Sequence, residues 1–203
     1  MNRIEKVLRQ IHADLASANV SCALVGGLAV SALTEPRFTR DADLTVATED
    51  DQAAESLVHS LQSKGYGVLA VVEQDAVGRL ASVRLAPPGE QPTGIVVDLL
   101  FASSGIEKEV VSQAESIELI EGLVIPTAQI GHLIALKVLS RDDENRPQDI
   151  ADLRQLIKSS TTEDIELARA SVELIMSRGF HRNRDLLSDL EELLRQGKAS
   201  PNK

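Results

Sequence analysis

The stretch VGGLAVSALTEPRFTRDADLTV, from Val25 to Val46, decides how the rest of the chain is interpreted. It holds the pair Gly26-Gly27 after a short apolar run, and then an acidic pair, Asp41 and Asp43, separated by one residue. The apolar run predicts a buried strand, and the residues after the glycines predict a helix that stops before the next proline. The acidic pair is expected to begin a second strand.

The acidic pair is a candidate metal site. Side chains two positions apart in a strand point to the same face, so Asp41 and Asp43 are expected to project together. Two carboxylates about 4 Å apart repel each other by about 4 kcal/mol at a surface-like dielectric, and a divalent cation offsets this repulsion. Mg²⁺ is typically held by one or two carboxylates together with substrate phosphates. Two solvated aspartates at a strand start are the alternative interpretation.

The glycine pair lies at the predicted junction of strand and helix, where the first backbone N–H groups of the helix have no partner within it. Glycine allows a phosphate group to approach that backbone closely. A tight turn with close packing is the alternative interpretation of Gly26 and Gly27. Together with the acidic pair, the glycines favour a phosphate-binding site beside a metal-binding one.

A third carboxylate, Asp98, interrupts the apolar stretch GIVVDLLFA. A buried lone carboxylate costs several kcal/mol unless it is paired or binds a metal. The alternation of this stretch also allows Asp98 to face outward on an edge strand. Three carboxylates on adjacent strands can hold two Mg²⁺ ions, which stabilise the attacking and leaving oxygens of an in-line displacement.

The hydrophobic periodicity divides the chain into an α/β core over residues 1–126 and a helical region over 127–197 packed on it. Thr48 is expected to cap the helix that follows the acidic strand. Residues 198–203 are expected to be disordered. The segments expected in the core are helices over 2–18, 27–35 and 48–64, strands over 20–26, 41–47, 67–72, 79–86 and 94–102, and a hairpin over 116–126. The helices expected after it cover 128–140, 147–159, 161–179 and 186–196.

Composition excludes several classes of protein. The formal net charge of the 203-residue chain is −10, whereas proteins that coat long nucleic acids are usually basic. Three Phe, one Tyr and no Trp leave almost no platform for stacking bases. No apolar run approaches the roughly 18 to 20 residues that span a bilayer, so we expect no membrane association. One cysteine and no signal-peptide pattern predict a cytoplasmic protein.

The glycine pair, the spaced aspartates and the later strand aspartate resemble the signature of the nucleotidyltransferase superfamily, which has a polymerase-β-like fold. A second block, LIALKVLSRDDENRPQDIADL, narrows the resemblance to the AbiEii-type nucleotidyltransferase toxins of bacterial toxin–antitoxin systems. The similar segments span residues 20–157. The resemblance implies an α/β (α+β) fold, with a mixed β-sheet flanked by helices and followed by a C-terminal helical half.

The resemblance also implies roles for residues in the first block. Gly26 and Gly27 would hold the triphosphate of an NTP, and Asp41 and Asp43 would bind Mg²⁺, with two ions expected. Asp98 would complete the metal site or take the proton from the acceptor hydroxyl.

In the second block, the resemblance implies that Lys137 contacts the nucleotide phosphates and that Asp149 orients Lys137 or the acceptor. Arg40, directly before the acidic pair, is included with the nucleotide-binding residues. From the residues alone, Lys137 is also consistent with a surface lysine whose stem lies along an apolar helix. Asp149 and Asp152 are also consistent with an ordinary capping or solvated pair.

The expected activity is transfer of a nucleoside monophosphate from an NTP to an acceptor hydroxyl. The resemblance suggests RNA, such as a tRNA end, as the acceptor, and an antitoxin protein as partner. Two alternatives stay open: adenylylation of a small cationic antibiotic of the aminoglycoside kind, and a non-catalytic nucleotide-binding protein of the same fold.

Overall fold

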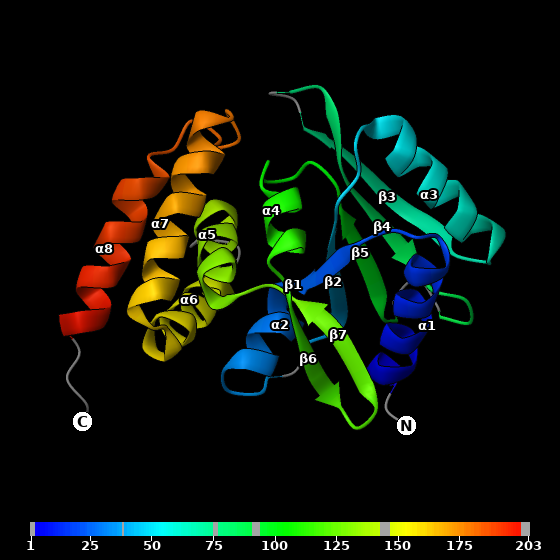
Figure 1. Cartoon of the computed structure of the whole chain (residues 1–203), viewed down its shortest axis with the longest axis horizontal. Coiled ribbons are helices and arrows are strands. Elements are labelled where there is room, and N and C mark those ends of the chain that lie inside the picture. Colours follow the sequence, from blue (N-terminus) through cyan, green and yellow to red (C-terminus); the bar gives the residue numbers. More distant parts are fainter. Residues whose placement is uncertain (1–2, 38, 75–76, 91–93, 143–146, 200–203) are drawn as a thin grey trace.

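One mixed sheet organises the protein. The structure is a computed structural model in which residues 3–37, 39–74, 77–90, 94–142 and 147–199 are described. Within these ranges, seven strands pair in the order β3-β4-β5-β2-β1-β7-β6 (Figure 1). The pairs β2–β5 and β1–β7 are parallel and the other neighbours are antiparallel. The strands are β1 (Cys22–Val25), β2 (Asp41–Val46), β3 (Gly67–Gln74), β4 (Arg79–Ala86), β5 (Val96–Leu100), β6 (Glu115–Ile120) and β7 (Leu123–Thr127).

The first helices of the chain flank this sheet, and the last four form a separate group. In Figure 1, α1 and α3 lie on one side of the molecule, and α5 to α8 gather on the opposite side. Helix α2 packs against β2 and also contacts α5 and α6. The bounds are α1 (Arg3–Ser17), α2 (Gly26–Leu33), α3 (Asp51–Ser63), α4 (Glu107–Ser112), α5 (Ile130–Ser140), α6 (Pro147–Ser159), α7 (Thr162–Ser177) and α8 (Leu186–Ala199). The predicted fold class, a mixed sheet flanked by helices and followed by a helical half, is confirmed.

The hydrophobic patterns account for the core. Helix α1 buries Val7, Leu8, Ile11 and Leu15, which recur at the spacing of one helical face. Strand β5 has neighbours on both edges and is buried along most of its length. Among the described residues, no helix combines the length and the apolar character needed to cross a membrane.

Most elements differ from the predicted ranges by a few residues at their ends, and three other differences have a physical reason. The helix expected from Thr48 begins at Asp51, because the carboxylate of Asp50 accepts the N–H of Ala53 and provides the cap. Helix α4 was not predicted, because its six residues are too few to show a helical period. Helix α8 continues to Ala199, two residues into the tail that was expected to be disordered, and residues 200–203 lie outside the described ranges.

Candidate active site

A row of charged side chains crosses the centre of the sheet. Asp43 on β2 is the register partner of Asp98 on β5, and Asp98 is the register partner of Arg84 on β4. Directly opposed residues on neighbouring strands place their side chains on the same face. Asp41 lies two positions before Asp43 and shares that face. The sheet therefore brings the three predicted carboxylates together, and Asp98 lies on an interior strand rather than an edge.

The glycine pair meets this row at the end of β1. Val25 is the register partner of Asp43, and α2 begins at the next residue, Gly26, which has φ +65°. A Cβ at Gly26 would lie 2.0 Å from Oδ2 of Asp43, so only glycine allows the carboxylate to approach this closely. The backbone N–H of Gly27 lies close enough to Asp43 to lower the pKa of its carboxyl group. The first turn of α2 and the carboxylate row thus form one continuous site.

Arg84 is the charged residue of this site that the sequence analysis missed. Its Nε and Nη2 atoms donate to Oδ1 and Oδ2 of Asp98 at 2.8 and 2.7 Å, and Nη2 lies 3.9 Å from Asp41. The signal was present, because Arg84 lies between the apolar residues Val83 and Leu85 within the predicted strand RLASVRLA. Its alignment with Asp98 depends on strand pairing that the sequence did not reveal.

Asp43 is a carboxylate of the row with a shifted pKa. The pKa of Asp43 is raised from 3.8 to about 6, first by burial and then by the negative charges of Asp98 and Asp41. Lys137 and the N–H of Gly27 oppose this rise. Arg84 has its pKa raised, chiefly by the hydrogen bonds to Asp98. The row therefore holds more negative charge than its surroundings neutralise.

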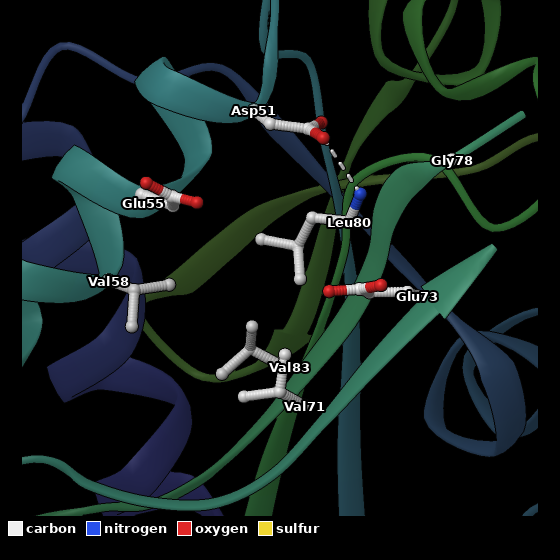
Figure 2. Close-up of a pocket in the computed structure, with 8 residues that line it drawn as sticks. All are labelled: Asp51, Glu55, Val58, Val71, Glu73, Gly78, Leu80 and Val83. Carbon is white, nitrogen blue, oxygen red and sulfur yellow. Dashed lines mark hydrogen bonds between the residues drawn. The ribbon is translucent and has the colours of Figure 1, made fainter.

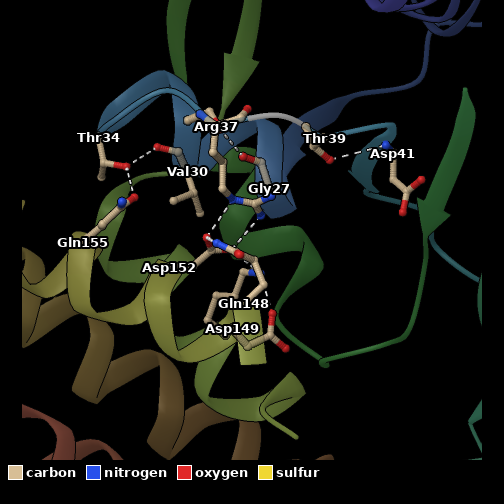
Figure 3. Close-up of polar contacts among 12 residues, drawn as sticks. Gly27, Val30, Thr34, Arg37, Thr39, Asp41, Gln148, Asp149, Asp152 and Gln155 are labelled. Atoms are coloured by element: carbon tan, nitrogen blue, oxygen red, sulfur yellow. Dashed lines mark hydrogen bonds and ion pairs between the residues drawn. The ribbon is translucent and has the colours of Figure 1, made fainter. Parts of the chain in front are cut away.

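A second cluster lies beside the glycines and joins the sheet to the helical half. Lys137 on α5 contacts Asp149 at 2.7 Å and Asp152 at 2.8 Å, both on α6. Arg37 forms a two-pronged ion pair with Asp152, with both hydrogen bonds 2.8 Å long. Figure 3 shows the guanidinium of Arg37 between Asp152 and Gly27, and a Cβ at Gly27 would lie 2.4 Å from its Nη2.

Burial excludes solvent-exposed positions for the charged groups of this cluster. Lys137 is only 8% exposed, and Asp149 and Asp152 are 2% and 0% exposed. Lys137 is therefore not a surface lysine, and the two aspartates are not a solvated pair. Arg37, which the sequence analysis did not single out, is the residue that links Gly27 to Asp152. Buried ion pairs of this kind persist only where hydrogen bonds satisfy the charges.

The chain matches over residues 7–202 the family described as Nucleotidyl transferase AbiEii toxin, Type IV TA system. It belongs to the AbiEii nucleotidyltransferase toxin family. The resemblance noted from the sequence is confirmed, and the protein is a nucleotidyltransferase. A search of curated proteins gave no match.

Solved structures share the fold of this AbiEii-family chain. An antigenic nucleotidyltransferase-like protein from Paracoccidioides brasiliensis is 20% identical, with a TM-score of 0.53, over 92% of this chain and 91% of that one. ANT(2″)-Ia in complex with adenylyl-2″-tobramycin is 19% identical, also with a TM-score of 0.53, over 85% and 98% of the chains. The lincosamide antibiotic adenylyltransferase LnuA, lincomycin-bound, is 16% identical, with a TM-score of 0.50, over 77% and 98%.

The three carboxylates suit a divalent cation, although the positive guanidinium of Arg84 already contacts Asp98. Among the described residues, no three histidine, cysteine or acidic side chains form a ready metal site. The three carboxylates nevertheless offer the hard oxygen ligands that Mg²⁺ prefers. The raised pKa of Asp43 reflects burial first and then repulsion by Asp98 and Asp41, and a cation would relieve that repulsion. Asp41, Asp43 and Asp98 therefore fit such an ion once Arg84 moves away from Asp98.

Arg40 lies directly before β2. Its side chain is exposed, and its backbone carbonyl accepts the N–H of Val96 at 3.4 Å. This hydrogen bond supports the start of the parallel β2–β5 pairing. A nucleotide-binding role for Arg40 remains a prediction.

A pocket of about 220 Å³ lies on the other face of the sheet (Figure 2). Val83, which lines it, is adjacent to Arg84 on β4, and successive strand residues point to opposite faces. It is lined by Asp51, Glu55, Val58, Val71, Glu73, Gly78, Leu80 and Val83. The pocket therefore contains none of the predicted site residues.

Replacing Gly26 by alanine is expected to destabilise the protein and to displace Asp43. The left-handed backbone costs a non-glycine residue about 1 to 2 kcal/mol, and the overlap with Oδ2 of Asp43 adds to this. Gly122→Ala is the matched control, because Gly122 has φ +69° and no atom within 4 Å of an added Cβ. Urea unfolding of both variants measures the difference. Equal losses of stability would show that the close approach to Asp43 is unimportant.

Proposed function

We propose that this protein transfers a nucleoside monophosphate from an NTP to a hydroxyl group of RNA, such as a tRNA end, as a toxin controlled by an antitoxin. The observation that carries the proposal is the row of carboxylates at the first turn of α2, with Lys137 close enough to lower the pKa of Asp43. Family membership supports the transferase chemistry and the toxin role.

The proposed step is an in-line displacement at the α-phosphorus. The acceptor oxygen forms a bond to phosphorus, the bond from phosphorus to the bridging oxygen breaks, and pyrophosphate leaves. The hydroxyl proton passes to a carboxylate, for which Asp98 is the proposed base. Mg²⁺, with two ions proposed, would be held by Asp41, Asp43 and Asp98 and would neutralise charge on the phosphates.

The remaining residues position the triphosphate in this proposal. Gly26 and Gly27 present backbone at the start of α2, where anions bind readily. Lys137 supplies a positive charge, and Asp149 fixes its direction through the 2.7 Å contact. Catalysis in phosphoryl transfer depends mainly on such positioning and on charge stabilisation.

A small cationic drug is the second candidate acceptor. The similar structures include ANT(2″)-Ia with adenylyl-2″-tobramycin and LnuA with lincomycin, and these likenesses concern the fold alone. The net charge of −10 would favour approach of a cation. This acceptor is therefore tested beside RNA.

Label transfer tests the proposed function. Purified protein and Mg²⁺ are mixed with each α-phosphate-labelled NTP in turn, with total RNA, with an aminoglycoside panel, or with no acceptor. Label on RNA from one NTP is the expected result, and the variant Asp41→Ala plus Asp43→Ala should give none. Label on a drug would replace the RNA proposal. No transfer and no NTP binding would favour a non-catalytic protein.

A further inference from the structure

Among the described residues, the guanidinium of Arg84 has only carboxylates as partners. Its hydrogen bonds and ion pairs within the described residues go to Asp98 and Asp41 alone. Its side chain is 46% exposed, whereas that of Asp98 is 13% exposed. Arg84 is thus held from one side only and has room to move toward solvent. Arg37, by contrast, is bound to the fully buried Asp152.

Arg84 and a divalent cation would use the same oxygen atoms. Both oxygens of Asp98 accept hydrogen bonds from the guanidinium, and the nearer oxygen of Asp41 faces it at 3.9 Å. Mg²⁺ sits about 2.0 to 2.1 Å from its carboxylate ligands, so an ion bound to Asp98 would lie within a few ångströms of the positive guanidinium. Repulsion at that distance makes the two cations mutually exclusive at Asp98.

We propose that Arg84 is an internal cation that occupies the carboxylate row until the nucleotide arrives, so that the free protein binds divalent metal weakly. An incoming triphosphate offers Arg84 another acceptor, because a guanidinium fits phosphate oxygens as well as it fits a carboxylate. Arg84 then leaves Asp98, and the released carboxylate accepts the metal. This inference rests on the proposed function, since it requires the carboxylates to hold a metal with the nucleotide.

Mn²⁺ binding without nucleotide is the first test, with free Mn²⁺ measured by electron paramagnetic resonance. Arg84→Met is expected to bind Mn²⁺ about 10-fold more tightly than the wild type, a typical coupling between two ligands of one site. Arg79→Met is the matched control, because Arg79 lies on the same strand and pairs with Asp51 at 3.1 Å, outside the carboxylate row. Its Mn²⁺ affinity should equal that of the wild type.

A conservative variant protects the test against misfolding. Arg84→Lys keeps the charge but loses the two-pronged hydrogen bond, so its Mn²⁺ affinity should lie between those of the wild type and Arg84→Met. Circular dichroism checks that each variant is folded. Unchanged Mn²⁺ affinity in a folded Arg84→Lys or Arg84→Met protein would overturn the proposal.

NTP binding in the presence of EDTA tests whether Arg84 moves to the phosphates of the nucleotide. For each NTP that binds to the wild type, the affinity of Arg84→Met should be about 10-fold lower. The affinity of Arg79→Met should equal that of the wild type. Equal affinities in Arg84→Met and the wild type would show that Arg84 does not move to the phosphates.

A separate variant distinguishes this inference from the proposed function. Adding Asp41→Asn and Asp43→Asn to Arg84→Met should remove the tight Mn²⁺ site. If these substitutions abolish metal binding but Arg84→Met alone has no effect, the role of Arg84 fails and the carboxylate site stands. If substitution of the aspartates leaves the Mn²⁺ affinity unchanged in every variant, both the role of Arg84 and the proposed carboxylate metal site fail.

Discussion

Asp43→Asn is expected to abolish nucleotidyl transfer while making the metal-free protein more stable at neutral pH. The activity should fall at least about 1,000-fold, because the proposed site loses the carboxylate between Asp41 and the first turn of α2. The gain in stability follows from the raised pKa of Asp43, which reflects burial and repulsion by Asp98 and Asp41. Asparagine removes that repulsion and keeps the shape of the side chain.

The difference in folding stability between Asp43→Asn and the wild type is expected to depend on pH. The pKa of Asp43 is about 6 in the folded protein, above its ordinary value of 3.8, so the folded state binds this proton more tightly than the unfolded chain. The resulting stabilisation of the wild type is complete below pH 3.8 and is lost as the pH rises through about 6. At pH 7 the variant should be more stable by about 1 to 3 kcal/mol.

Urea unfolding in EDTA between pH 4 and pH 8 measures this difference. The stabilities of the two proteins should converge as the pH falls, because Asp43 becomes neutral in the wild type. Asp189→Asn is a suitable control, since Asp189 forms a partly exposed ion pair with Arg184. A variant Asp43→Asn that is less stable than the wild type at pH 7 would contradict the assignment of strain to this carboxylate.

Asp152→Ala is expected to cause the largest loss of folding stability, about 3 to 5 kcal/mol. Asp152 is fully buried and receives both Arg37 and Lys137, so its removal takes one carboxylate from each of two cations and leaves Lys137 with Asp149. Breaking a buried ion pair from one side is more harmful than replacing the whole pair, because the remaining charge stays desolvated. Urea unfolding at pH 7 gives the loss directly.

Two further variants test whether the loss of stability in Asp152→Ala comes from its buried ion pairs. Asp152→Asn keeps the shape and some hydrogen bonds, so its loss should be smaller than that of alanine. Asp189→Ala breaks an ion pair whose side chains are 30% and 32% exposed and should cost at most about 1 kcal/mol. Equal, small losses in all three variants would mean that Asp152 is not the anchor of this cluster.

The sequence predicted those parts of the site that depend on local periodicity. The spacing of Asp41 and Asp43 placed both on one face of a strand, because the side-chain period of two holds wherever a strand forms. The glycines were placed at the junction of strand and helix for the same local reason. Their second role, making room for Asp43, depends on the β1–β2 register, which no local pattern contains.

The missed residues depend on contacts between distant segments. Arg84 reaches Asp98 because β4 and β5 pair with that register, and a shift of one residue would have turned it to the opposite face. Arg37 and Asp152 are 115 residues apart and meet only after α6 packs near α2. Arg84 and Arg37 could both be seen in the sequence as charged residues near the site motifs. Their partners, Asp98 and Asp152, could not be inferred from it.

The position of Asp152 has a consequence for protein synthesis. The ribosome completes the sheet strands and the glycine turn before α5 and α6 emerge, so a growing chain has the acidic row but lacks both Lys137 and the carboxylate that receives Arg37. A chain that ends before α5 would therefore carry the recognisable motif but lack the cation that lowers the pKa of Asp43.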